Sequence, residues 1–148
     1  MADIEEHPSW LALREELGGI TAATGAANAY VLDAWGNLWC SARSVPENIL
    51  QFAVRIAEFI VRTTKPPITR GGKLDQSVPT QGAVAGYIRS FSGVYILLVL
   101  SETRMDRGTI QVLRAIITRA LPRIEALTLS LPPPDGPGPS SGEGFGVA

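Results

Sequence analysis

The sequence predicts an α+β domain in which one mainly antiparallel five-stranded sheet is flanked by helices, in the order αββαβββα. Three observations carry this prediction. Two short apolar runs around a glycine turn at residues 27–43 have the pattern of a β-hairpin. Residues 44–64 have the period of a helix. The apolar run at 94–100, followed by a second helical pattern, is typical of a central strand covered on both faces.

The first predicted helix follows an acidic N-terminal segment, residues 1–8. Ser9 is its expected cap and Gly25 its expected end. Between them, residues at helical spacing place one apolar stripe on a single face. The stripe comprises Trp10, Leu13, Leu17, Ile20 and Thr24.

The hairpin is predicted from two runs rich in Tyr, Val, Leu and Trp, at 27–33 and 37–43. Gly36 supplies the positive φ that a tight turn needs. Strict alternation places Leu38 and Cys40 on the same face of the second strand. Cys40 is therefore interpreted as a small buried apolar residue rather than a reactive thiol.

The central predicted helix, with Ser44 as its cap, Pro46 in its first turn and Pro66 after its end, has more apolar surface than one sheet covers. Two stripes together span roughly 220° of it, whereas one packed face needs about 100°. The first comprises Ile49, Phe52, Ala53, Ile56, Phe59 and Ile60. The second, expected to form a dimer interface with the same helix of another copy, comprises Leu50, Val54, Ala57 and Val61. The alternative is a helix sandwiched within its own monomer.

The second half of the chain is predicted to complete the sheet and add a last helix. A short edge strand falls somewhere between Lys73 and Gly82, and strands follow at 83–91 and 94–100. Asp106 is the expected cap of the last helix, and Pro122 is expected to kink it. The predicted domain spans 9–131, and the Pro/Gly/Ser-rich residues 132–148 form a disordered tail.

Composition narrows the possible functions of this 148-residue chain. It has a formal net charge of −1, one histidine (His7) and one cysteine (Cys40). These counts exclude a His/Cys zinc site and an internal disulfide, so we expect no catalytic residue, no metal site and no cofactor. Residues 43–123 carry twelve Arg or Lys against five acids. This excess of positive charge indicates either an ordinary solvated surface or a mildly basic face that attracts an acidic partner. Nucleic-acid and membrane binding are not expected.

Two stretches resemble a known family. Leu32 to Ala42 is similar to the hairpin pattern of the roadblock/dynein light chain family, apolar-Asp-x-x-Gly-x-Leu-x-x-Ser. Tyr87 to Ile110 is similar to that family's two closing strands, polar loop and final helix. The resemblance covers about residues 9–130, and implies a roadblock/longin-like fold. It departs at 65–82, a Pro- and Gly-rich stretch where family members place the strand that pairs with its twin across the dimer.

The resemblance is strongest to bacterial roadblock proteins that work with a small Ras-like GTPase in polarity and gliding motility. It implies a cytoplasmic, non-enzymatic homodimer that binds and regulates, or bridges, such a GTPase module or a sister roadblock protein. A roadblock domain of this kind stimulates hydrolysis by holding its GTPase in a competent shape. Two alternatives stay open: a PAS- or GAF-like small-molecule sensor, which needs a polar-lined pocket, and a scaffold without a GTPase partner.

Overall fold

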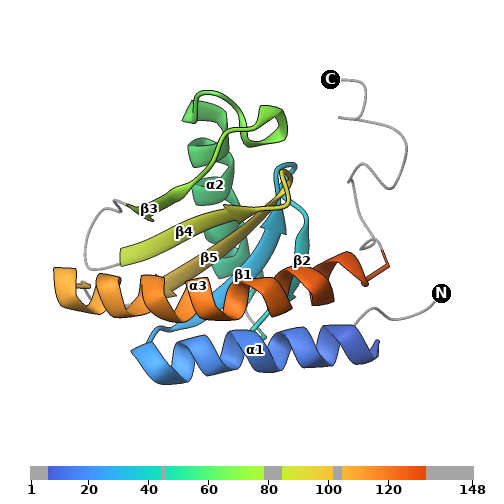
Figure 1. The fold of residues 1–148 in the computed structure, drawn as a ribbon, viewed down its shortest axis with the longest axis vertical. Coiled ribbons are helices and arrows are strands. Elements are labelled where there is room, and N and C mark those ends of the chain that lie inside the picture. Colours follow the sequence, from blue (N-terminus) through green and yellow to red (C-terminus); the bar gives the residue numbers. More distant parts are fainter. Residues whose placement is uncertain (1–6, 45, 79–84, 102–104, 133–148) are drawn as a thin grey trace.

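A computed structural model describes residues 7–44, 46–78, 85–101 and 105–132 of the chain. The predicted α+β fold is confirmed, with three helices, a short 3-10 turn and five strands in the described parts (Figure 1). In chain order they are α1 (Pro8–Thr24), β1 (Asn28–Asp33), β2 (Leu38–Ser41), α2 (Glu47–Thr63), η2 (Ile68–Arg70), β3 (Asp75–Val78), β4 (Ala85–Phe91), β5 (Tyr95–Ser101) and α3 (Arg107–Leu129).

The five strands form one sheet in the order β2-β1-β5-β4-β3, and every neighbouring pair is antiparallel. β5 lies at the centre, as the apolar run at 94–100 predicted. The unplaced edge strand is β3, which pairs with β4 from Asp75 opposite Arg89 to Val78 opposite Gly86. The turn between β4 and β5 is confirmed, with positive φ at Ser92 and Gly93.

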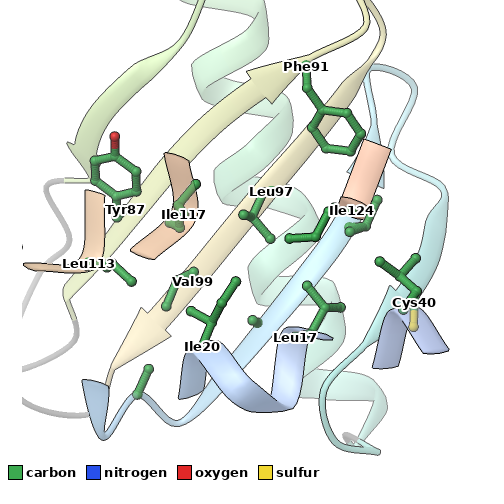
Figure 2. Packing of buried hydrophobic residues seen from close by; sticks show 14 of the residues in the cluster. Leu17, Ile20, Cys40, Tyr87, Phe91, Leu97, Val99, Leu113, Ile117 and Ile124 are labelled. Carbon is green, nitrogen blue, oxygen red and sulfur yellow. The ribbon is translucent and has the colours of Figure 1, made fainter. Parts of the chain in front are cut away.

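Helices cover both faces of this sheet. α1 and α3 lie side by side on one face, and α2 crosses the other (Figure 1). Figure 2 shows Leu17 and Ile20 of α1 packing with Ile117 of α3 over Leu97 and Val99 of β5. Alternate residues of the same strands point the opposite way and pack under α2, namely Tyr30, Leu32, Ile88, Ile96, Leu98 and Leu100. The central strand is thus buried on both faces by the monomer itself.

The second strand of the hairpin differs from the prediction. Val31 pairs with Cys40, whereas the next residue, Leu32, pairs with Leu38, so a β-bulge lies at Trp39. Strict alternation fails there. Leu38 packs on the α2 side of the sheet, whereas Cys40 is buried on the α1 side. The prediction that these two residues share a face is therefore wrong, although the burial of Cys40 is confirmed at 1% exposure.

Some of the predicted helix-end residues are confirmed and others are wrong. Gly25 ends α1 with a φ of 72°, and Asp106 caps α3 by accepting from the Thr109 N–H at 2.7 Å, both as predicted. α1 is capped by His7, whose Nδ1 accepts from the Ser9 N–H at 3.1 Å, rather than by Ser9. Likewise, Pro46 rather than Ser44 is the residue before the first turn of α2.

Pro122 lies inside α3, which runs as one helix from Arg107 to Leu129. Most of the tail predicted at 132–148 lies outside the described residues. The last buried residue of the chain that the structure describes is Leu131, which packs in the core under α1 and α3.

Candidate interaction surface

The apolar residues of α2 divide into those that are buried against the sheet and those that are left exposed. Ala53, Ala57 and Ile60 face the sheet and are 0%, 1% and 6% exposed. Two alanines at this spacing let the helix approach the sheet closely. Away from this contact, Ile49 in the first turn and Phe59 near the end of the helix are 45% and 60% exposed. The helix therefore leaves large apolar side chains uncovered by its own chain.

The four residues predicted to form a dimer interface lie on the flank of α2 nearer the sheet. Ala57 is covered by its own chain, so a partner could reach little of it. Leu50, Val54 and Val61 are half-buried, and the two valines pack against the core under α2. Of the first stripe, Ala53 and Ile60 are buried against the sheet, whereas Ile49 and Phe59 are exposed. A role for Leu50, Val54 and Val61 in a dimer stays a prediction.

The turn of the β1–β2 hairpin stands beside this surface and is held by one carboxylate. Asp33 is 2% exposed. Its Oδ1 accepts from the backbone N–H groups of Trp35 at 2.9 Å and Asn37 at 3.0 Å. Its Oδ2 accepts from the Asn37 side-chain amide at 3.0 Å and from the Trp39 indole N–H at 2.9 Å. One acidic side chain thereby fixes the turn and the indole of β2.

The turn also contacts α2. Gly36 has a φ of 87°, and a Cβ added there would lie 3.3 Å from Val54 Cγ1 and 3.7 Å from the Glu58 carboxyl carbon. Glycine is therefore needed both for the backbone angle and for the close approach. Beyond the turn, the exposed polar arc of α2 carries Arg55, Glu58 and Arg62. A partner on this side meets an apolar patch bordered by both signs of charge.

Burial and neighbouring groups shift the pKa of two tyrosines. Burial raises the pKa of Tyr30, and a hydrogen bond with Asn28 opposes part of that rise. Burial also raises the pKa of Tyr95, and the nearby Asp33 carboxylate adds to the effect because it repels a phenolate. In both cases the surroundings favour the neutral phenol over the phenolate.

The candidate reactive residues have structural partners. His7 caps α1, and Cys40 Sγ lies 3.7 Å from the Trp10 carbonyl oxygen in the core. Within the described residues, no three His, Cys, Asp or Glu side chains are grouped as they would be to hold a metal ion. No helix in this part of the chain is long and apolar enough to span a membrane.

Two hollows in the described surface lie at the edges of the sheet. They have volumes of about 500 and 510 Å³, one between the end of α1 and Arg43 and the other between η2, the end of β4 and α3. Both faces of the central strands are filled by fully buried apolar side chains. This apolar filling does not favour a PAS- or GAF-like sensor, which needs a polar-lined pocket.

Comparison with known proteins identifies the fold. No family model and no curated protein matches the sequence. Solved structures do match: a Roadblock/LC7 domain from Streptomyces avermitilis has a TM-score of 0.57 at 15% identity, covering 76% of this chain and 97% of its own. The chain therefore has the fold of roadblock domains.

Within that class the structure is similar to MglB. Myxococcus xanthus MglB matches with a TM-score of 0.63 at 16% identity over 88% of this chain and 97% of its own. An MglB with a tetrameric arrangement matches with a TM-score of 0.62 at 16% identity over 82% and 93%. These likenesses establish the shared fold, which the hairpin and closing strands had indicated.

Proposed function

We propose that this chain is a homodimeric, non-catalytic roadblock protein of the cytoplasm that binds and regulates, or bridges, a small Ras-like GTPase module in cell polarity and motility. The observation that supports this proposal most is the apolar surface that α2 leaves uncovered at Ile49 and at Phe59, on a fold shared with MglB. A protein of this kind acts by shape. It holds a partner in a competent conformation and supplies no reacting group of its own.

The self-association step is supported by energetics as well as by the fold. Moving one Phe side chain from water into a packed interface contributes about 1.5–3 kcal/mol. A two-fold axis through α2 covers Phe59 twice, because each subunit presents the same residue. The tetrameric arrangement of one similar MglB lends further support to contact between copies. The half-buried Leu50, Val54 and Val61 would border the contact.

Phe59→Asp tests this step, because the side chain is exposed and the change leaves the core intact. Leu129→Asp on α3 is the matched control, since Leu129 is 59% exposed and Phe59 60%. Sedimentation equilibrium should show a wild-type dimer, a Phe59→Asp variant at least about a hundredfold weaker in self-association, and a control like wild type. A wild-type chain that stays monomeric at high concentration contradicts the proposal.

The GTPase step needs a separate titration. The purified chain is titrated with a small Ras-like GTPase of the same organism, loaded either with GDP or with a non-hydrolysable GTP analogue, and with sister roadblock proteins. We expect binding to the GTP-loaded form or to a sister protein. Absence of binding to all of them at tens of micromolar would leave the scaffold alternative ahead, even if the chain dimerises.

A further inference from the structure

A second surface lies on the face of the sheet opposite α2, where α1 and α3 run side by side and antiparallel (Figure 1). A hollow of about 320 Å³ lies between the two helices. Its apolar lining comprises Gly19, Ile20, Ile116 and Ala120. One turn before Ile116, Val112 is 55% exposed. From Leu17 to Thr24, α1 has no charged residue. The outward side of a surface helix is ordinarily polar, so this stretch suits contact with protein better than contact with water.

The charges beside the hollow are separated between the two helices. Glu15 and Glu16 lie on α1, whereas Arg119 and Arg123 lie on α3. Arg14 of α1 instead bonds to the chain beyond β2. Glu16 pairs with Arg123 at 3.1 Å. Glu15 and Arg119 are both exposed, and neither takes part in an ion pair among the residues that the structure describes. The surface is therefore neutral in sum, with negative charge on one helix and positive charge on the other.

A neutral surface with separated charges suits a second copy of the same chain better than a strongly acidic or basic partner. Rotation by 180° about an axis along the groove would lay α1 of each copy over α3 of the other. The Glu16–Arg123 pair places these parts of the two helices at the same level. Glu15 of one copy would then come close to Arg119 of the other, and the two-fold axis would repeat that contact.

We propose that the α1–α3 surface is a second self-association site, on which another copy of this chain docks face to face. Glu15 of each copy pairs with Arg119 of the other, and the aliphatic stem of that arginine covers the apolar hollow. The contact needs high concentration and low salt, because ion pairs at a surface are weak and are screened by ions.

The consequence is an assembly larger than a dimer. α2 lies on the opposite face of the sheet, so the α1–α3 contact would join the proposed α2 dimers to one another. The two contacts use different residues and can fail separately. A chain without the α2 contact could still pair through α1 and α3, and the reverse also holds.

The test is made in the full-length Phe59→Asp variant, in which the proposed α2 contact is weakened. Sedimentation equilibrium at low salt, up to about 1 mM protein, should show pairs that dissociate as salt is raised. Glu15→Arg or Arg119→Glu, each added to Phe59→Asp, should weaken the pairing about tenfold, because two like-charged contacts replace two attractive ones. Adding both changes together restores opposite charges and should return the affinity to within about threefold of Phe59→Asp alone.

The matched control is Arg107→Glu, a charge reversal at an exposed arginine in the first turn of α3, away from the hollow. It should leave the pairing within about twofold of Phe59→Asp, and thermal melts establish that each variant is folded. A Phe59→Asp chain that stays monomeric at about 1 mM would overturn the site. So would equal weakening by Arg107→Glu, single reversals without effect, or a double reversal that does not restore the pairing.

Discussion

Replacing the buried Asp33 by alanine should strongly destabilise the β1–β2 hairpin. The carboxylate accepts hydrogen bonds from groups on Trp35, Asn37 and Trp39, all between 2.9 and 3.0 Å at their shortest. In Asp33→Ala, water can reach the half-exposed turn and replace part of what Trp35 and Asn37 lose. The Trp39 indole N–H must either stay unpaired or move.

The size of the expected loss of stability follows from the hydrogen-bond donors that lose their acceptor. Taking about 0.5 kcal/mol for each of the three Trp35 and Asn37 donors, which water can reach, and about 1.5 kcal/mol for the indole, the loss of unfolding free energy is about 3 kcal/mol. With an unfolding entropy of about 2.1 cal/mol/K for each ordered residue, that corresponds to a fall in Tm of about 10 °C. Asp33→Asn should lose about half as much, because one oxygen still accepts.

Urea denaturation and thermal melts at one fixed protein concentration measure the effect, since self-association would otherwise change the apparent stability. Asp75→Ala is the control: its carboxylate is on the exposed edge strand β3, and its ion pairs there should contribute less than about 1 kcal/mol. If Asp33→Ala melts within about 3 °C of wild type, the carboxylate does not hold the turn.

Two further predictions concern buried tyrosines. The Tyr87 hydroxyl is buried without a hydrogen-bond partner among the described residues, so Tyr87→Phe should raise the unfolding free energy by about 1 kcal/mol in urea denaturation, and a loss of stability would reveal an unseen partner. The raised pKa of Tyr30 and Tyr95 makes the unfolded chain lose these protons first, so the contribution of the two tyrosines to stability should be constant up to about pH 10 and fall above it. Tyr95→Phe should weaken that alkaline fall, measured as the urea midpoint against pH.

The hairpin, the central strand and the cap of α3 could be predicted because each depends on residues close together in sequence. Asp33 and Gly36 specify a turn locally. Seven apolar residues in a row specify a strand that is covered on both faces of the sheet. The bulge at Trp39 could not be predicted. It shifts the register of the strand, but the order of polar and apolar residues in the sequence gives no sign of it. β3 has no pattern of its own: three of its four residues are exposed, and pairing with β4 rather than burial makes it a strand.

The sequence did not predict which residues of α2 face the sheet and which stay exposed. The width of its apolar surface correctly indicated that one sheet would not cover all of it, but residue types alone favoured burying the larger stripe. The sheet takes Ala53 and Ile60 of that stripe together with Ala57 of the other, because the two alanines allow the helix axis to come close to β5 and strand side chains fill the remaining space. Phe59 follows Ala57 by two residues, so it lies about 200° around the helix from Ala57, points away from the sheet and remains 60% exposed. Any protein that covers α2 must therefore fit around Phe59, which makes this residue, more than Val54, the one whose change should separate folding from assembly.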